Sequence, residues 1–312
     1  MADMSRIGEL DVFPLCLGGN VFGWTADKET SFEILDAYAA AGGNFIDTSD
    51  SYMASAPGNS GGESEAIIGE WAQARGNRDD MVIATKVGRH PDRMGLAPAN
   101  IKAAADDSLR RLRTDRIDLY FTHFDDPSVP VEEIMTALDE LVTEGKVRQI
   151  AVSNIELDRL EASLEFSERQ GTARYVAIQP HYNLVSRDTY EGPRRDIAAR
   201  HGLAALPYYG LASGFLTGKY RPGANVDSVR AGKAARHLET ERGRKVLAAL
   251  DIVAEEQGAA VATVALAWLA AQPTVAAPIA SARTLDQLPP LVEAARTTLT
   301  DEQLERLTEA SA

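Results

Sequence analysis

The sequence is poor in cysteine, in long hydrophobic runs and in positive charge. It holds one cysteine, Cys16, among 312 residues, so no disulfide can form within the chain and nothing indicates an oxidising compartment. Cys16 lies in an apolar run, and we expect an inert core thiol. No apolar run approaches the ~20 residues of a membrane-spanning helix, and the first residues lack the order of a signal peptide. These absences predict a soluble cytoplasmic protein.

Acidic residues outnumber basic ones, and the formal net charge is −14. This balance argues against nucleic acid or an anionic membrane as a partner, because both need a positive protein surface. An anionic ligand would need a local cationic pocket set against the overall field. The sequence predicts no metal site, and no G-x-G-x-x-G loop follows an expected strand.

Short apolar runs alternate with longer amphipathic segments along the whole chain. Such runs are typical of parallel strands covered on both faces. The runs are residues 14–18, 44–48, 81–86, 117–123, 148–154, 175–180, 203–208 and 275–280. Eight strands with helical crossovers predict a closed (β/α)8 barrel formed by one domain, residues 1–312. A doubly wound open sheet is the alternative, since strand number alone does not show closure.

Residues 216–243 depart from this alternation, because they are polar and rich in glycine with poor periodicity. We interpret them as an insertion loop after the seventh strand that acts as a lid.

Polar residues follow the expected strands. Asp47 ends the second, with Tyr52 shortly after it, Lys86 ends the third and His123 the fourth. In such a barrel the active site lies at the carboxyl ends of the strands, so these four side chains should converge. Each has a plainer interpretation as a cap, a packing residue or a solvated charge. Their convergence at one point favours a catalytic role over these plainer interpretations.

The expected tetrad makes a proton donor. Free tyrosine has a pKa of about 10, and we expect the Lys86 cation, held by Asp47, to lower that of Tyr52. Tyr52 would then protonate a carbonyl oxygen, and His123 would orient that oxygen by a hydrogen bond. Because these groups supply no hydride, a redox cofactor is required.

Seven motifs in order resemble the aldo-keto reductase superfamily nearly from end to end. They are NFIDTSDSY, VIATKVG, DLYFTHFDDP, IAVSN, IQPHYN, PYYGLASGFLTGKY and PIASARTLDQL. GKVRQIAVSN and LASGFLTGKY most resemble the bacterial and potassium-channel-beta branch. The resemblance implies an enzyme with Tyr52 as general acid, assisted by Lys86, Asp47 and His123, and an extended nicotinamide dinucleotide across the barrel mouth.

The resemblance also implies the residues that bind the cofactor. Ser153, Asn154 and Gln179 would meet the carboxamide, and Tyr208 would stack on the nicotinamide ring. Backbone at Gly19 and Asn20 can approach a ligand closely, next to Asp47. The pyrophosphate path would be formed by Leu211, Ser213 and Lys219, and the adenosine end by Ser281, Arg283 and Gln287.

Arg283 favours NADPH over NADH, because a guanidinium suits a 2′-phosphate. The segment around it departs from the family, since Pro290 and Leu291 stand where a Glu-Asn pair usually holds the adenine. Tandem Pro289 and Pro290 also disfavour a helix there. Candidates for the substrate pocket are Trp24, Met53, Phe124 and Tyr209.

Three functions are consistent with these residues. The first is an NADPH-dependent reductase of aldehydes or ketones. The second is a cofactor-binding regulatory protein on the same barrel, since fold alone does not determine function; the intact tetrad and the lack of an extra N-terminal segment argue against it. The third, a keto-sugar reductase of a biosynthetic pathway, uses the same chemistry as the first, and the sequence does not separate the two.

Overall fold

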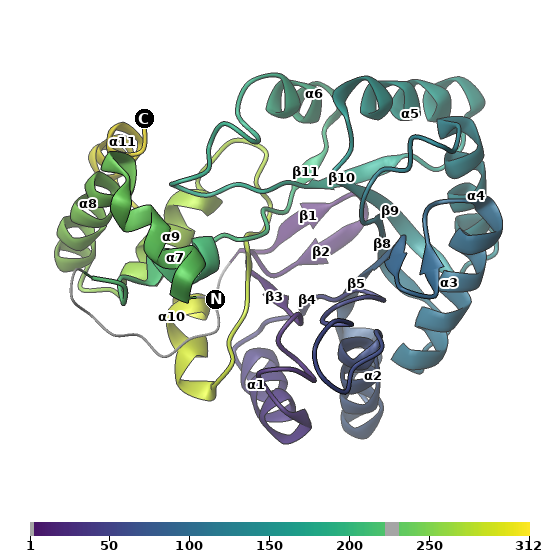
Figure 1. Cartoon of the computed structure of the whole chain (residues 1–312), viewed down its shortest axis with the longest axis horizontal. Helices are drawn as coiled ribbons and strands as arrows, with labels where there is room; N and C mark the ends of the chain where they lie inside the picture. The colour runs from purple at the N-terminus through teal and green to yellow at the C-terminus, as the bar shows by residue number, and fades with distance from the viewer. Residues whose placement is uncertain (1–2, 222–230) are drawn as a thin grey trace.

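The computed structural model describes residues 3–221 and 231–312. Its centre is a sheet of eight parallel strands whose spatial order is β11-β10-β9-β8-β5-β4-β3-β12 (Figure 1). The strands are β3 (Cys16–Gly18), β4 (Phe45–Asp47), β5 (Val82–Val87), β8 (Ile117–Thr122), β9 (Val147–Ser153), β10 (Tyr175–Gln179), β11 (Ala204–Ala205) and β12 (Ile279–Ala280). All eight fall within the expected runs or one residue outside them, which confirms the predicted order.

The sheet curls until its two ends meet. β12 pairs with β3 at one end, and Ala205 of β11 forms a parallel bridge with Val275 at the other. Ala276 N donates to Ala205 O, and Ile279 N donates to Pro207 O. These bonds close the ring, so the (β/α)8 barrel is confirmed over the open sheet.

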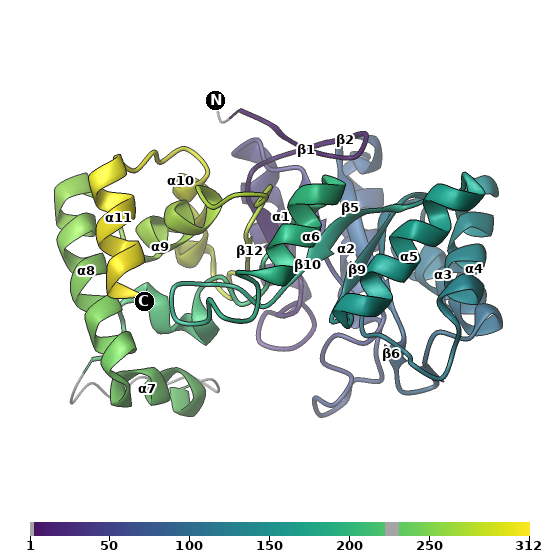
Figure 2. The same cartoon turned by 90° about the horizontal axis from the view of Figure 1, so that it is seen from above.

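A short hairpin, β1 (Ser5–Ile7) with β2 (Leu10–Val12), covers the amino-terminal end of the barrel (Figure 2). Its residues Ile7, Leu10 and Val12 are buried in the same apolar cluster as the inward side chains of the strands. Cys16 belongs to this cluster, and burial raises the pKa of its thiol, as expected of an unreactive core cysteine. The sequence did not predict this hairpin, because its runs are only three residues long.

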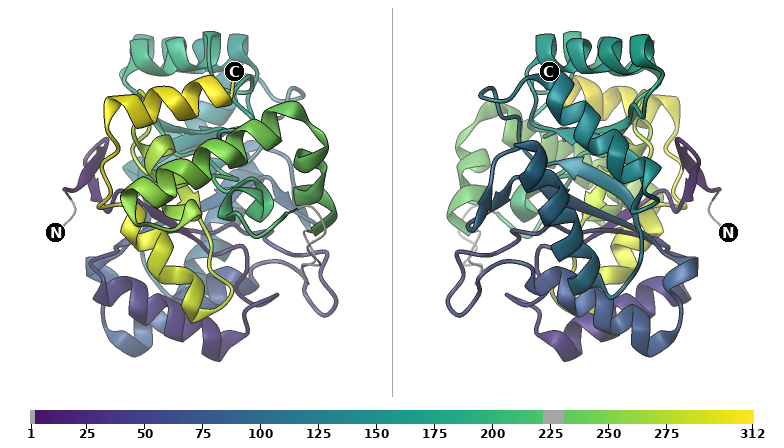
Figure 3. Two further views of the ribbon diagram at one scale, coloured as in Figure 1. Left: turned by 90° about the vertical axis from the view of Figure 1, so that its left-hand side faces the viewer. Right: turned by 90° about the vertical axis from the view of Figure 1, so that its right-hand side faces the viewer.

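Helices surround the barrel and enclose a second, larger apolar cluster between themselves and the sheet (Figure 3). The first six are α1 (Lys28–Ala40), α2 (Glu63–Arg75), α3 (Pro98–Leu112), α4 (Val131–Thr143), α5 (Leu157–Gln170) and α6 (Pro193–His201). Asp27 caps α1 by accepting from Thr30 N, and Gly42 beyond its end has a φ of 92°. A left-handed backbone there suits glycine, which allows the chain to leave the helix.

The carboxyl-terminal helices gather at one side of the barrel (Figure 3, left). They are α7 (Ala231–Glu239), α8 (Glu241–Gln257), α9 (Val261–Ala270), α10 (Leu288–Ala294) and α11 (Asp301–Ala310). Short 3-10 turns are η1 (Arg78–Asp80), η2 (Ala212–Thr217) and η3 (Leu285–Gln287), and a small hairpin joins β6 (Arg89–His90) to β7 (Arg93–Met94).

Two expectations about this part of the chain are wrong. Residues 216–243 are not a loop throughout, because α7 and the start of α8 lie within them. α7 is stabilised by contact with η2, where the rings of Phe215 and His237 lie 5.0 Å apart. Residues 222–230 of the expected lid lie outside the described residues.

The second correction concerns the prolines after η3. Pro289 and Pro290 begin α10 instead of preventing it. In the first turn of a helix the missing N–H groups have no intrahelical partner in any case, so proline is tolerated there.

Asp118 offers a test of how the barrel is held. Its carboxylate is fully buried at the start of β8 and accepts from Arg78 Nη2 at 2.7 Å, Arg148 Nη1 at 3.2 Å and Ile83 N at 3.0 Å. Asp118→Ala should lower the free energy of unfolding by about 3–5 kcal/mol, because it leaves a half-buried cation and a buried N–H unpaired. Urea unfolding measures this loss. Asp115→Ala is the control, since its side chain is 91% exposed; an equal loss in both variants would contradict the argument.

Candidate active site

The inward positions of the strands end in polar residues. Alternate residues face the barrel interior, and the apolar members of this set are Phe45, Ala84, Phe121, Ala151, Ala177 and Leu206. Two positions further along each strand stand Asp47, Lys86, His123, Ser153, Gln179 and Tyr208. The period of two thus gathers one polar side chain from each of six strands at the carboxyl end of the barrel.

The four expected residues meet there. Lys86 Nζ lies 2.6 Å and 2.7 Å from the two carboxylate oxygens of Asp47 and 2.6 Å from Tyr52 Oη. Tyr52 Oη donates to Asp47 Oδ2 at 2.6 Å, and Lys86 also donates to Thr48 O at 2.8 Å. Lys86 is fully buried and Asp47 is 2% exposed. The ammonium therefore has four oxygen partners, which are both carboxylate oxygens of Asp47, Thr48 O and Tyr52 Oη. A buried charge requires such partners.

The expected pKa of Tyr52 is wrong. Burial raises it well above 10, and the negative charge of Asp47 raises it further. The physical reason is that Asp47 neutralises Lys86, so the phenol meets an ion pair instead of a lone cation. Burial also lowers the pKa of Lys86, although Asp47 opposes that shift. Tyr52 is consequently a neutral phenol at pH 7, with its proton in place.

His123 follows β8 and faces Tyr52, with the two ring centroids 6.0 Å apart in an edge-on arrangement. Burial, and then the charges of Lys86 and Arg89, hold the pKa of His123 well below its usual 6.5. Its Nδ1 lies 3.3 Å from Ser49 Oγ. Because the ring is neutral and its Nδ1 already contacts Ser49, Nε2 is the nitrogen that remains to contact a ligand.

A second hydrogen-bonded row lies beside the tetrad. Tyr208 Oη donates to Asn154 Oδ1 at 3.0 Å, and Asn154 Nδ2 donates to Ser153 Oγ and to His123 O, both at 2.9 Å. Gln179 Nε2 donates to Asp47 Oδ1 at 3.0 Å. This row connects the expected carboxamide-binding residues to the ion pair below them.

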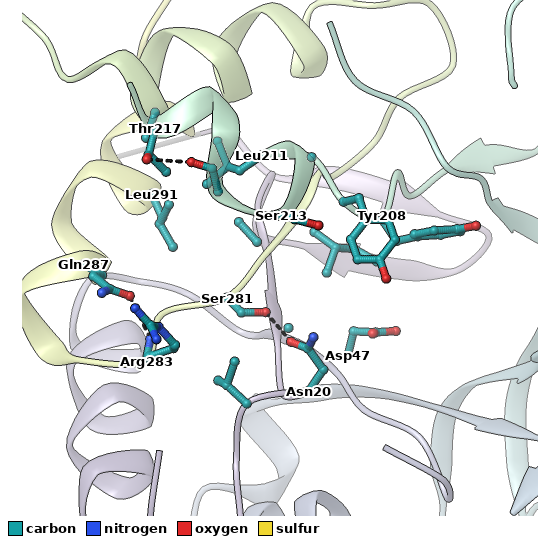
Figure 4. A pocket seen from close by; sticks show the side chains of 18 of the residues that line it. Asn20, Asp47, Tyr208, Leu211, Ser213, Thr217, Ser281, Arg283, Gln287 and Leu291 are labelled. Atoms are coloured by element: carbon teal, nitrogen blue, oxygen red, sulfur yellow. Dashed lines mark hydrogen bonds between the residues drawn. The ribbon is translucent and has the colours of Figure 1, made fainter. Parts of the chain in front are cut away.

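The site opens into a cavity of about 550 Å³. It runs from Asp47 and Tyr208 past Ser213 and Ser281 to Arg283 and Gln287 (Figure 4). Ser281 Oγ donates to Asn20 Oδ1 at 2.6 Å, and Gln287 Oε1 accepts from Arg283 N at 3.0 Å. The expected residues that line this cavity are Asn20, Asp47, Tyr52, His123, Phe124, Ser153, Asn154, Gln179, Tyr208, Tyr209, Leu211, Ser213, Lys219, Ser281, Arg283 and Gln287.

Gly19, Met53, Trp24 and Lys86 are not among the residues that line the cavity. Lys86 lies beneath it, bonded to Asp47. Gly19 helps to hold the backbone of Asp47 in place, since Gly19 N donates to Asp47 O at 2.7 Å. Trp24 lines a separate shallow depression with Lys28 and Glu70, because the chain turns back at residues 21–26 before α1.

Sequence reasoning missed several lining residues, mostly small or apolar ones. They are Val21, Gly210, Gly214, Thr217, Ala260, Ala262, Ile279, Ala280 and Asp286. Pro290 and Leu291, which stand where the family's adenine-binding pair is expected, also line the cavity. Neighbouring backbone is unusual, since Asn154, Tyr209 and Ser213 have φ values of 48°, 55° and 59°. Residues other than glycine rarely adopt this conformation, and it is concentrated at functional sites. The motifs PYYGLASGFLTGKY and PIASARTLDQL, which contain Gly210, Gly214, Thr217, Ile279, Ala280 and Asp286, were the available signal.

Comparison with known proteins gives the class. The model of the aldo/keto reductase family matches residues 14–312. An aryl-alcohol dehydrogenase [NADP(+)] of Phanerodontia chrysosporium is 34% identical, over 96% of this chain and 82% of its own length. Norsolorinic acid reductase B of Aspergillus parasiticus is 32% identical, over 98% and 83%. A putative aryl-alcohol dehydrogenase of Saccharomyces cerevisiae is 32% identical, over 97% and 84%.

The chain therefore belongs to the aldo/keto reductase family of oxidoreductases, as the seven motifs predicted. In residues 3–221 and 231–312 no single helix is long and apolar enough to cross a membrane; α8 and α9 pass that test only as a pair bent by 98°. In the same residues no three histidine, cysteine, aspartate or glutamate side chains form a group able to hold a metal ion.

The lowered pKa of His123 predicts a pH dependence of stability. A histidine whose folded pKa lies below its unfolded value binds protons preferentially in the unfolded chain, so stability is lost as the pH falls below about 6.5. His123→Gln should reduce the slope of unfolding free energy against pH between pH 6.5 and 5 by up to about 1.4 kcal/mol per unit. Urea unfolding at several pH values measures it, and equal slopes in both proteins would contradict the shift.

Proposed function

We propose that this protein reduces an aryl aldehyde or ketone to the alcohol with NADPH, using Tyr52 as the proton donor. One observation carries the proposal: Tyr52 Oη lies 2.6 Å from both Lys86 Nζ and Asp47 Oδ2 at the floor of a cavity with aromatic walls. The family membership supports the reaction class, and the names of the relatives support the substrate class.

The residues of the cavity suit a nicotinamide dinucleotide. Amide and hydroxyl groups of Ser153, Asn154 and Gln179 stand near the tetrad, where a carboxamide would need them, and the ring of Tyr208 lies beside them. Lys219 and Arg283 also line the cavity, and Arg283 lies at the end away from Asp47 (Figure 4), so both can supply the cations that phosphates need. A nicotinamide dinucleotide bound here supplies the hydride that carbonyl reduction requires.

Proton transfer is the task of the tetrad. Tyr52 Oη gives its proton to the carbonyl oxygen, which becomes an alcohol, and the resulting phenolate remains within 2.6 Å of Lys86 Nζ. The raised pKa of Tyr52 is no obstacle, because an alkoxide is a far stronger base than a phenolate. Asp47 fixes the ammonium by two contacts, so no reorganisation is needed when the negative charge appears.

His123 orients the substrate. With Nδ1 toward Ser49, its Nε2–H is placed to donate to the same carbonyl oxygen. Phe124 and Tyr209 line the cavity and remain 40% and 47% exposed, which is unusual for large aromatic side chains. We assign them to the walls that receive an aromatic substrate.

Two of the other expected roles stay part of the proposal. Arg283 binds the 2′-phosphate of NADPH, since no salt bridge to its guanidinium occurs among the described residues, although the Asp286 carboxylate shares the cavity. Leu211, Ser213 and Lys219 line the path of the pyrophosphate. The backbone of Ser213 is left-handed, and this conformation turns the segment toward the cavity.

Tyr52→Phe tests the proton donor. It should reduce kcat for an aryl aldehyde by a factor of about 10²–10⁴, the range for loss of a general acid, with cofactor affinity nearly unchanged. Loss of NADPH absorbance measures kcat, and fluorescence titration measures binding. Tyr120→Phe is the control, because Tyr120 is buried on β8 outside the cavity. A Tyr52→Phe enzyme with native kcat would end the assignment.

Arg283→Gln tests the cofactor preference. It should raise KM for NADPH by about 10–100-fold, the effect of losing hydrogen bonds to a charged group, and leave KM for NADH within about threefold. Arg296→Gln serves as control, since Arg296 follows α10 and donates to Ala41 O away from the cavity. Equal increases for both cofactors would place Arg283 elsewhere than at the 2′-phosphate.

A further inference from the structure

Asp50 is a buried carboxyl group that the mechanism above does not use. It is 1% exposed and lies between Ser49 and Ser51, two residues before Tyr52. Its backbone is fixed, because Asp50 N donates to Lys86 O at 3.3 Å. One carboxyl oxygen, Oδ1, accepts from Ser49 Oγ at 3.2 Å. The other, Oδ2, is buried without a hydrogen-bond partner among the described residues.

An unpaired oxygen in this place requires an explanation, since buried polar atoms are nearly always bonded. The neighbouring acid, Glu65 on α2, is satisfied. It accepts from Thr85 Oγ1 at 2.5 Å and from Arg111 Nε at 2.6 Å. Arg111 is thereby committed to Glu65, and Asp50 is left beside a second carboxylate with no cation of its own. A proton on Asp50 would remove the repulsion between the two.

Ser49 joins Asp50 to His123. Its hydroxyl lies 3.2 Å from Asp50 Oδ1, 3.3 Å from His123 Nδ1 and 3.1 Å from Ser51 Oγ, where either hydroxyl can be the donor. It also accepts from Ser51 N at 3.2 Å. A hydroxyl has one proton to donate. If Asp50 is ionised, Ser49 donates to it and must accept from a proton on His123 Nδ1. If Asp50 is protonated, it donates to Ser49, and Ser49 donates to a bare Nδ1.

We propose that Asp50 is a positioning residue that sets the tautomer of His123 through Ser49. A protonated Asp50 leaves the ring proton on Nε2, which faces the cavity and can donate to the carbonyl oxygen. An ionised Asp50 moves the ring proton to Nδ1 and turns Nε2 into an acceptor, which repels a carbonyl oxygen. The proton count of the chain Asp50–Ser49–His123 changes by one between the two states, and solvent supplies or takes that proton.

The electrostatic surroundings place this change near neutrality. Burial, and then the charge of Glu65, raise the pKa of Asp50 to about 7, while the nearby hydroxyls of Ser51 and Ser49 and the charge of Arg111 oppose the rise. The other titratable groups near Asp50, from the strands and loops around it, are Lys86, Tyr120, His90 and His123. Because the raised pKa belongs to an acid, the protonated, active form prevails below pH 7 and is lost as the pH rises.

This inference rests on the proposed function, and its first test uses turnover. For the native enzyme, kcat/KM for an aryl aldehyde with NADPH should fall by roughly tenfold or more between pH 6 and pH 8.5, as Asp50 ionises. Asp50→Asn has an amide that donates to Ser49 at every pH. Its kcat/KM at pH 6 should therefore be within about twofold of its kcat/KM at pH 8.5, and its kcat/KM at pH 8.5 should exceed that of the native enzyme. Ser49→Ala should also have nearly equal kcat/KM at the two pH values, at a uniformly lower level. Retention of the native inflection in Asp50→Asn would overturn the proposal.

A second test does not need turnover. Nitrogen-15 NMR of the full chain distinguishes the two neutral histidine tautomers, and the spectrum of His123→Gln identifies the signal of His123 among the five histidines. The native ring should change from the Nε2–H to the Nδ1–H form between pH 6 and pH 8.5, and Asp50→Asn should stay Nε2–H. An unchanged native tautomer would refute the link. If no carbonyl compound is reduced at all, the proposed function fails and this spectrum still decides the role of Asp50.

Discussion

The ion pair between Lys86 and Asp47 is the contact on which the site depends. An ammonium with no exposed surface is stable only with charged and hydrogen-bonded partners, and here it has Asp47, Thr48 O and Tyr52 Oη. Those partners come from different segments, so the pair forms only when β4 and β5 lie side by side. Their register, with Asp47 opposite Ala84, puts Lys86 two residues further along and on the same face. The barrel thus aligns the charges, and the charges hold Tyr52.

Much of this could be read from the sequence, because a strand has a period of two. Short apolar runs located all eight strands, and the residue at the end of each inward-facing set was a candidate for the site. Asp47, Lys86, His123, Ser153, Gln179 and Tyr208 all follow that rule. The resemblance of seven motifs to one family then added roles that periodicity alone does not supply. Trp24 and Met53 were chosen by residue type without such a rule, and neither lines the cavity.

The wrong predictions have a common cause: the sequence of a segment does not show which distant residues it will contact in the fold. Prolines at 289 and 290 looked incompatible with a helix, yet their place in its first turn makes them harmless. α7 looked like a loop because its stabilising partner, η2, comes earlier in the chain, with Phe215 22 residues before His237. The pKa of Tyr52 was assigned from a lysine nearby, although the balance depends on burial and on how fully Asp47 neutralises that lysine. The carboxyl of Asp50 carried no sequence signal, since its unpaired oxygen exists only in the fold.

The distribution of charge along the cavity gives the site a direction. At the floor, the charges of Asp47 and Lys86 sum to zero, while burial and the adjacent Asp47 carboxylate keep the proton on Tyr52 in the free protein. Among the described residues, Lys219 and Arg283 are cations that line the cavity, and Arg283 lies at the end away from Asp47 (Figure 4). In a chain with a net charge of −14, an anionic ligand meets favourable potential only near such local cations. A dinucleotide is anionic in its phosphates and nearly neutral at the reduced nicotinamide. For the dinucleotide that we propose as cofactor, this charge distribution favours the orientation with the nicotinamide near Tyr52 and the phosphates toward Arg283.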